Sequence, residues 1–474
     1  MLVEKQIEPN SFESQNHWYE KVLNATIHPI VKHFLNMSQE QIITRYCHLN
    51  PKANKKKLKE LLNYRAKFFV WCGTDLVNVT SSTGKRQMVV IENNSCPSGQ
   101  KSMPLINEYS EETTYHQLIK NTFKNALKNV RMKGVLAVIY DKNYMEASGY
   151  ATAIADVVNE KVYLIPFKNQ EENPKVRFEK DVMYIQYQEK WLKVRDCFRY
   201  VTQKPWNRLP VLSKTKIINP IISCLAGGRN KLIAAKAYEL FNSEIKEYGL
   251  EVNILNTVWE VRKNEVPLWV KQMGGHAVIK VPYSNAGQGV YAIVTEQDLE
   301  EFMKMEFDYD MFIVQSLIGN SDWSSTFNNQ KLYHVGTIPN KRNQTFVCDI
   351  RMMVSSTNQG IKPLCTYARR AKKPLPSELE EVVNSWEILG TNLSYKENDI
   401  WKSDSNRLVL MDTKDFNSLG IGIDDLIDAF IQSALSMIAI DKMSQMLISS
   451  KGTLKKKLFK SLNDDQNLIN EILC

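Results

Sequence analysis

Residues 274–294 read Gly274-Gly275-His276-Ala277-Val278-Ile279-Lys280-Val281-Pro282-Tyr283-Ser284-Asn285-Ala286-Gly287-Gln288-Gly289-Val290-Tyr291-Ala292-Ile293-Val294. Two apolar runs, His276 to Val281 and Val290 to Val294, flank a loop of small residues and are typical of strands. Thr295 follows, with Asp298 three residues later, which is the spacing of a helix N-cap. The stretch therefore predicts a strand–loop–strand hairpin that runs into a helix.

The loop of this hairpin has the composition of a phosphate-binding loop. Gly287 and Gly289 let the backbone approach an anion closely, and Ser284 offers a hydroxyl group. Lys280, after an apolar run, would reach a phosphate as a point charge. The spacing matches neither G-x-x-x-x-G-K-S/T nor G-x-G-x-x-G, and the loop lies between two strands, which excludes a P-loop and a Rossmann motif. An ordinary glycine-rich hairpin is the alternative.

Two later segments carry polar side chains on predicted strands. Residues 311–319 form a strand that can present backbone groups to an adenine ring, with Gln315 and Leu317 along it. In residues 346–354, Asp349 and Arg351 share one face because alternate strand residues do. A basic strand end and an acidic strand end follow, at Arg369-Arg370 and at Asp412-Thr413-Lys414-Asp415-Phe416-Asn417.

The order of these features is more informative than any one of them. A phosphate-facing lysine, a strand–glycine-loop–strand unit, a hinge strand, an Asp-Ile-Arg strand and an acidic strand end succeed one another over residues 216–440. This order resembles the ATP-grasp superfamily. The resemblance implies an α/β protein in which ATP lies between two α+β subdomains, with Mg²⁺ bridging its phosphates.

The resemblance also implies roles for individual residues. The cofactor-binding residues would be Lys280, Ser284, Asn285, Ala286, Gly287, Gln288, Gly289, Gln315, Leu317 and Asp349, with Lys231 or Lys236 as a second lysine. Lys280 would contact phosphate, residues 284–289 would cover the triphosphate, and Gln315 would lie at the adenine hinge. Arg351, with Arg369 or Arg370, would stabilise charge on the transferring phosphate.

Two sets of oxygen ligands compete for the metal. We expect Mg²⁺ at Asp412, Asp415 and Asn417, although the superfamily has a glutamate where this chain has aspartate. The alternative set is Glu92 and Asn94. Their E-x-N spacing resembles the metal loop of glutathionylspermidine synthases and eukaryotic glutathione synthetases, whose motif order is permuted. Asp75 would supplement this alternative set.

The chain is expected to divide into three parts. These are an N-terminal helical and α/β domain over residues 1–215, an ATP-grasp domain over 216–440, and a helical tail over 441–474. The resemblance implies an ATP-dependent ligase that joins a small-molecule or peptide carboxylate to an amine through an acyl phosphate. A nucleotide-binding regulatory or interaction protein with a degenerate site is the alternative, because of the aspartates at 412 and 415.

Bulk composition is that of a cytoplasmic globular protein. The 474 residues contain no 18-residue apolar run, so we expect no membrane span, and no C-x-x-C pair, so we expect reduced cysteines. The net charge of +9 fits an anionic ligand. Lysine runs at 55–57 and 455–457 are expected to lie on solvated helix faces, and nucleic-acid binding is not favoured because no known module is present. The oligomeric state is left open.

Overall fold

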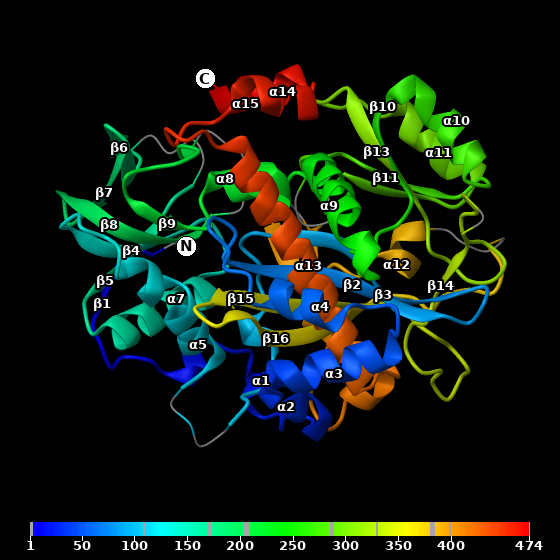
Figure 1. Cartoon of the computed structure of the whole chain (residues 1–474), viewed down its shortest axis with the longest axis horizontal. Helices are drawn as coiled ribbons and strands as arrows, with labels where there is room; N and C mark the ends of the chain where they lie inside the picture. Colours follow the sequence, from blue (N-terminus) through cyan, green and yellow to red (C-terminus); the bar gives the residue numbers. More distant parts are fainter. Residues whose placement is uncertain are drawn as a thin grey trace.

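The computed structural model describes residues 3–107, 110, 112–168, 173–201, 208–284, 289–328, 330–379, 384–397 and 400–473. Three main sheets and their helices make a mixed α/β protein, which confirms the predicted fold class (Figure 1). A two-stranded hairpin completes the described strands: β17 (Ser394–Glu397) with β18 (Ile400–Ser403). None of the described helices is long and apolar enough to cross a bilayer.

The N-terminal sheet is partly parallel. Its strands, in spatial order, are β1 (Lys5–Ile7), β5 (Val162–Pro166), β4 (Val135–Tyr140), β8 (Lys190–Tyr200), β7 (Val182–Tyr187) and β6 (Val176–Glu179), and β9 (Lys216–Ile218) also pairs with β8. β4 runs parallel to both β5 and β8. The neighbouring helices are α5 (Thr114–Asn121), α6 (Phe123–Leu127) and α7 (Tyr144–Val158). β4 ends directly before residues 141–143, which enter α7.

The central sheet is antiparallel and draws on distant parts of the chain. Its order is β14 (Leu332–His334), β2 (Trp71–Ser81), β15 (Cys348–Thr357), β16 (Gly360–Arg370) and β19 (Leu408–Val409), and β3 (Arg86–Asn94) also pairs with β2. In particular, β2 pairs with β15 along seven residues of each strand. Segments on either side of residue 215 thus share one sheet, a pairing that linear reading of the sequence does not reveal.

The four-stranded sheet contains the hairpin that the sequence analysis started from. Its antiparallel order is β10 (Thr257–Arg262), β13 (Met311–Ser316), β11 (Ala277–Lys280) and β12 (Val290–Ile293). Helices α10 (Val266–Gln272) and α11 (Glu296–Lys304) belong to this unit, which has its own apolar core. Thr295 and Asp298 form the predicted cap of α11. The predicted strand–loop–strand–helix order is therefore confirmed.

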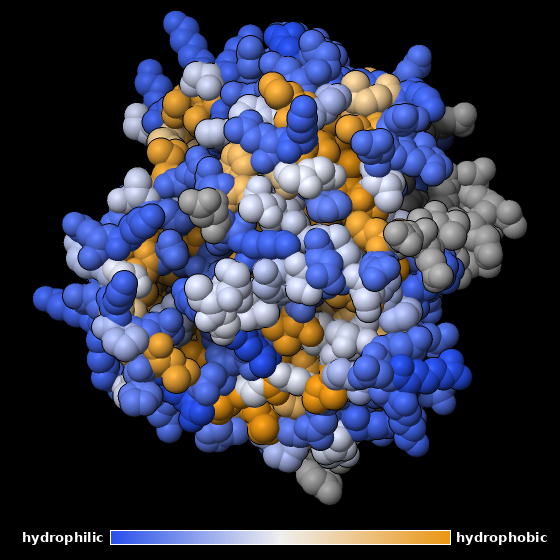
Figure 2. All heavy atoms as spheres, turned by 90° about the vertical axis from the view of Figure 1, so that its right-hand side faces the viewer, coloured by the Kyte–Doolittle hydropathy of each residue, from blue (hydrophilic) through white to orange (hydrophobic). Residues whose placement is uncertain are grey.

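Helices link the sheets. The long helix α13 (Ile423–Leu447) packs on β3, β15 and α9 (Lys231–Ile245) (Figure 1). The remaining helices are α1 (Glu20–Leu23), α2 (Pro29–Asn36), α3 (Gln39–Leu49), α4 (Lys55–Leu62), α8 (Ile221–Ser223), α12 (Ser385–Leu389), α14 (Lys456–Leu462) and α15 (Gln466–Leu473). Figure 2 shows a face on which hydrophilic residues predominate, with hydrophobic atoms visible between them.

Candidate functional site

A cavity of about 300 Å³ lies between the central sheet and the four-stranded sheet. Its walls come from segments that are far apart in the sequence. They include Asp75 on β2, Glu92 on β3, Lys280 on β11, Gln315 on β13 and Arg351 on β15. The segments 94–102, 142–143 and 229–231 contribute further residues to the wall. The cavity falls within the usual size range of small-molecule sites.

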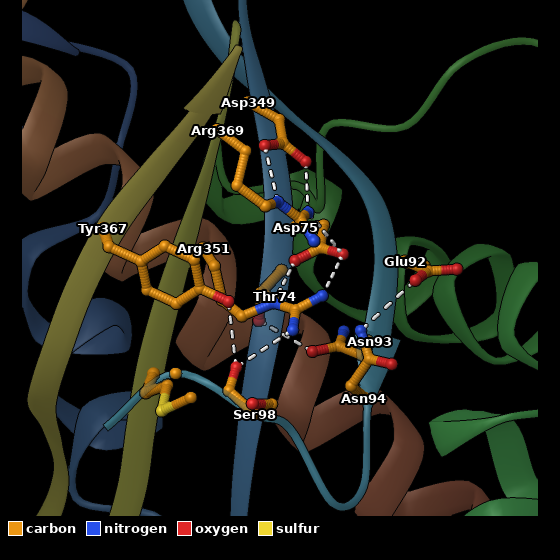
Figure 3. A network of polar contacts seen from close by, with 12 residues as sticks. Thr74, Asp75, Glu92, Asn93, Asn94, Ser98, Asp349, Arg351, Tyr367 and Arg369 are labelled. Carbon is orange, nitrogen blue, oxygen red and sulfur yellow. Dashed lines mark hydrogen bonds and ion pairs between the residues drawn. The ribbon is translucent and has the colours of Figure 1, made fainter. Parts of the chain in front are cut away.

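Four charged side chains form a buried network on the central sheet (Figure 3). Nε and Nη2 of Arg351 lie 2.5 and 2.6 Å from Oδ1 and Oδ2 of Asp75, on the adjacent strand. Arg369 pairs with Asp349 across β15 and β16, and its Nη2 lies 3.0 Å from Asp75 Oδ2. Two arginines and two carboxylates therefore balance one another in the sheet.

The charge balance fixes the ionisation of Asp75. Burial disfavours the charged carboxylate most strongly, but Arg351 and Arg369 together outweigh burial and hold the pKa of Asp75 below its usual range. Arg351 also donates from Nη1 to the carbonyl oxygen of Ser98 at 3.1 Å, and Tyr367 donates to the same oxygen at 2.9 Å (Figure 3). The network thus also fixes the loop that follows β3.

Two lysines converge from the other side of the cavity. Lys280 is 6% exposed, and its Nζ donates to Gln315 Oε1 at 2.7 Å. Lys231, the first residue of α9, donates to the carbonyl oxygen and to Oγ of Ser284 at 3.1 and 3.2 Å. Burial lowers the pKa of Lys280 to about 8, although the negative charge of Glu92 favours the protonated amine and acts in the opposite direction. A bound anion would reverse this shift.

The structure distinguishes the two candidates for the second lysine. Lys231 lines the cavity and lies 3.8 Å from the carboxylate of Glu92. Lys236, in contrast, pairs with Glu260 at 2.6 Å and donates to the carbonyl oxygen of Leu462 at 2.8 Å. Lys236 does not line the cavity. Five residues turn the helix α9 by more than one turn, so the two side chains leave it in different directions.

The two acidic sets lie in different places. Glu92 and Asn94, at the end of β3, line the cavity, and Asn94 Nδ2 donates to Glu92 Oε1 at 3.3 Å. Asp412 instead accepts the backbone N–H groups of Lys414 and Asp415 at 3.2 and 2.6 Å, which closes a turn. None of Asp412, Asp415 and Asn417 lines the cavity.

The C-terminal set, the preferred metal site of the sequence analysis, therefore does not share the cavity of Lys231, Lys280 and Arg351. Its aspartates hold a turn together, as Asp side chains commonly do, and this role looks the same in sequence as a metal loop. Within the described ranges, no three His, Cys, Asp or Glu side chains are grouped as a metal site. Glu92 and Asn94 still supply two oxygen donors beside the lysines. This number suits Mg²⁺, which commonly takes one or two carboxylates together with substrate phosphates.

The glycine loop is described at its two ends. Gly289 has a φ of +66°, and a Cβ there would lie 2.8 Å from the Cβ of Val281, so this position favours glycine. Val281 N–H donates to the carbonyl oxygen of Gly289 at 2.7 Å, which closes the base of the hairpin. Asn285, Ala286, Gly287 and Gln288 lie outside the described residues.

Gln315 and Leu317 on the predicted hinge strand already have hydrogen-bond partners within the protein. Gln315 accepts from Lys280 and donates to Thr257 Oγ1 at 2.8 Å, so its side chain positions the lysine amine. The backbone N–H and carbonyl of Leu317 are both bonded to Ser325, at 2.7 and 3.0 Å. Leu317 therefore offers the cavity its apolar side chain, alongside Val278 and other apolar residues.

Two polar atoms in the same cavity wall have no hydrogen-bond partner in the described part of the chain. They are Ser316 Oγ and His334 Nδ1, and both residues line the cavity. Burial lowers the pKa of His334 to about 4, so the imidazole is neutral at physiological pH. Sequence reasoning missed His334 because β14 is only three residues long and carries no motif.

Arg370 does not belong to the cavity, unlike its neighbour Arg369. Its guanidinium lies 4.8 Å from the centre of the Phe346 ring. Successive residues of a strand point to opposite faces, so only one of the two arginines can face Asp75. Sequence reasoning also missed Lys101, Lys142 and Arg229 in the cavity wall. No periodic pattern marked them.

Comparisons with known proteins give the following. No protein-family model matches the chain, and no curated protein matches it. A RimK domain protein of the ATP-grasp type from Sphaerobacter thermophilus aligns with a TM-score of 0.27 and 11% identity, over 49% of this chain and 90% of that one. A glutathione synthetase-like effector from Globodera pallida aligns with a TM-score of 0.39 and 9% identity, over 73% of this chain and 85% of that one. The D-alanine–D-alanine ligase from Coxiella burnetii aligns with a TM-score of 0.23 and 10% identity, over 66% of this chain and 97% of that one. With TM-scores this low, these likenesses carry no inference about the function of this chain.

Proposed function

We propose that the chain is an ATP-dependent ligase of the ATP-grasp type that joins a carboxylate to an amine. The observation that carries this proposal is the convergence, in one cavity, of Lys231 and Lys280, Glu92 and Asn94, and Arg351. These are the groups that phosphoryl transfer requires, because its catalysis consists mainly of positioning and of offsetting negative charge.

The charge of the cavity supports a polyanionic ligand. Cationic side chains outnumber carboxylates in its wall by seven to three. The cations are Lys101, Lys142, Arg229, Lys231, Lys280, Arg351 and Arg369, and the carboxylates are Asp75, Glu92 and Asp349. In the proposed complex the triphosphate lies against Lys231 and Lys280. The adenine lies at the apolar end, where Ser316 Oγ and His334 Nδ1 are available to its polar edge.

Glu92 and Asn94 are the proposed ligands of Mg²⁺. A bound Mg²⁺ would neutralise charge on the phosphates and hold them in line for transfer. Asp75 is less suited to this role, because both of its oxygens are already paired with Arg351 and Arg369. Lys231 lies beside Glu92 and would contact the same phosphates from the protein side.

The proposed reaction has two steps. An oxygen of the substrate carboxylate attacks the γ-phosphorus, the bond from that phosphorus to the bridging oxygen breaks, and ADP leaves. The guanidinium of Arg351 offsets the charge that develops on the transferring group. The nitrogen of the amine then attacks the acyl carbon, inorganic phosphate leaves with the electrons of the carbon–oxygen bond, and the nitrogen loses a proton to solvent. Exclusion of water would protect the acyl phosphate.

No observation favours the alternative of a regulatory protein without turnover. Its motive was the replacement of glutamate by aspartate at positions 412 and 415. Those residues do not line the cavity, and the groups that do line it include both lysines and Glu92.

An assay of ADP release tests the proposal, run with ATP and Mg²⁺ across panels of acids and amines. Glu92→Gln should raise the Mg²⁺ concentration needed for half-maximal turnover by at least about tenfold, since even partners of metal ligands show losses of this size. Asp415→Asn is the matched control and should leave this requirement unchanged. Metal dependence that moves with Asp415 and not with Glu92 would return the metal to the C-terminal set. ADP release that requires neither acid nor amine would contradict ligase chemistry.

A further inference from the structure

Two lysines of the cavity wall have no carboxylate partner among the described residues. The three carboxylates of the wall are engaged by other cations: Asp75 and Asp349 by arginines, and Glu92 by Lys231. Lys101 and Lys142 also line the cavity. Neither Lys101 nor Lys142 forms a hydrogen bond through its amine, or an ion pair, with any residue that the structure describes. These two lysines therefore differ from the paired cations of the site.

The position of Lys101 is fixed by a buried carboxylate. Glu146 on α7 is fully buried and accepts the N–H groups of Gly99 and Gln100 at 2.7 and 2.9 Å, and the hydroxyl of Ser98 at 2.5 Å. These bonds hold the loop just before Lys101. Lys101 itself is only 8% exposed, and its ammonium lies 5.0 Å from the centre of the Tyr19 ring. The fold thus builds a cation into the wall and leaves the space before it open.

Lys142 lies where α/β proteins commonly bind ligands. It follows the carboxyl end of β4, the strand that runs parallel to β5 and β8, and ligands of open α/β sheets bind outside such strand ends. The neighbouring carboxylate, Asp141, is bound by Arg208 at 3.0 Å. Burial and the nearby charge of Arg229 lower the pKa of Lys142 to about 8. Asp141 acts in the opposite direction on Lys142, but its charge does not offset this lowering.

Arg351 connects these lysines to the proposed site of phosphate transfer. It donates to the carbonyl oxygen of Ser98, three residues before Lys101, and its charge also acts on Lys142. Arg229 acts on both Lys142 and Lys231. An acid substrate whose carboxylate reacts beside Arg351 would therefore be able to reach towards Lys101 and Lys142.

We propose that Lys101 and Lys142 bind a second anionic group of the acid substrate. The substrate class is then an acid with two anionic groups, one that takes the phosphate and one that these lysines hold. The inference rests on the proposed function for the identity of the reacting group, but the binding of the second anion does not depend on turnover. A carboxylate and a phosphonate share the required chemistry.

Calorimetry on the full chain with a non-hydrolysable ATP analogue and Mg²⁺ tests this. The probes are glutarate and 3-phosphonopropionate, with butyrate as the monoanionic control. Both dianions should bind at least about tenfold more tightly than butyrate, as charge-assisted bonds to lysine imply. Lys142→Met and Lys101→Met should each abolish this preference, and Lys142→Arg should retain it. Lys214→Met, on an exposed side chain, is the matched control and should change nothing.

Equal binding of the three probes would overturn the inference, as would a preference that survives in both methionine variants. If Lys142→Met instead weakens the ATP analogue itself, the lysine belongs to the nucleotide site and the inference fails. The outcomes that would contradict the ligase proposal are different from these. A dianion that binds with the predicted preference but never supports ADP release contradicts only the ligase chemistry, and turnover of monoanionic acids alone contradicts only the second anion site.

Discussion

Arg351 and Arg369 differ from Lys101 and Lys142 in one respect, although all four line the same cavity. The arginines are held by Asp75 and Asp349 at ion-pair distance, whereas the lysines have no carboxylate partner in the described part of the chain. A buried charge with a partner has a fixed position before any ligand arrives. A cation without a partner gains one only when an anion binds. The first pair therefore prepares the geometry of the site, and the second selects its ligand.

Removing the Asp75 carboxylate from its network with Arg351 and Arg369 should give the largest effect. Asp75→Asn leaves two buried guanidinium groups without their shared partner and should lower the free energy of unfolding by about 3–5 kcal/mol. Turnover should be lost with it, because Arg351 would no longer be held. Denaturant unfolding measures the first effect. Asp181→Asn breaks only an exposed contact with Lys214 and should stay within about 1 kcal/mol. Similar losses in both variants would show that the network does not stabilise the fold.

An intermediate effect is expected at Lys280, which has a polar partner but no bonded carboxylate. Lys280→Met should weaken ATP by about ten- to 150-fold, the equivalent of roughly 1.5–3 kcal/mol for a charge-assisted bond. In the unmodified protein the pKa of Lys280 is about 8. Because ATP prefers the protonated amine, affinity should be constant below pH 8 and fall by up to about tenfold per pH unit above it.

The same titration identifies the group responsible. Glu92, Lys231 and Gln315 surround the Lys280 amine, and the pKa of Lys231 is also lowered by burial. Lys280→Met should therefore make ATP affinity fall less steeply with pH above pH 8. The fall that remains in this variant would be due to Lys231. Calorimetry at constant ionic strength from pH 6.5 to 9.5 measures it. An ATP affinity that Lys280→Met leaves unchanged would remove this lysine from the nucleotide site.

Cations outside the cavity should give the smallest effect. Lys55 pairs with Glu40 and Lys57 with Glu60, at 2.8 and 2.9 Å, on the first turns of α4. Such exposed pairs contribute at most about 1 kcal/mol each. Replacing Lys55, Lys56 and Lys57 by glutamine should leave kcat/KM unchanged in the ADP-release assay. A loss beyond about tenfold would mean that this helix docks an acidic partner and that charge outside the cavity also selects ligands.

Local patterns in the sequence predicted local structure well. The strands around the glycine loop follow from apolar runs and turn residues between Ala277 and Ile293, and the cap of α11 follows from Thr295 and Asp298, three residues apart. The shared face of Asp349 and Arg351 also follows from the period of a strand. Each of these features depends on residues that are close in the chain. Helix bounds are less predictable: the chain leaves the helix α1 after Leu23, and Pro29 begins α2.

Contacts between distant segments were beyond this kind of reasoning. Nothing near Asp75 indicates that its partner is Arg351, and nothing near Glu92 indicates that Lys231 lies 3.8 Å away. The acids at 412 and 415 satisfied the local pattern of a metal site but form a turn. Choosing between the two sets requires the order of strands in the central sheet, which side-chain periodicity does not encode.

The pairing of β2 with β15 also has a consequence for the synthesis of the protein. Asp75 and Arg351 are 276 residues apart. At the usual 5–20 residues per second, a ribosome needs roughly 15–55 s to make the intervening chain. During that time β2 and β3 have emerged but lack the strand that covers one of their edges, and an uncovered edge is prone to pair wrongly. The nascent N-terminal segment therefore needs protection of this edge until β15 emerges.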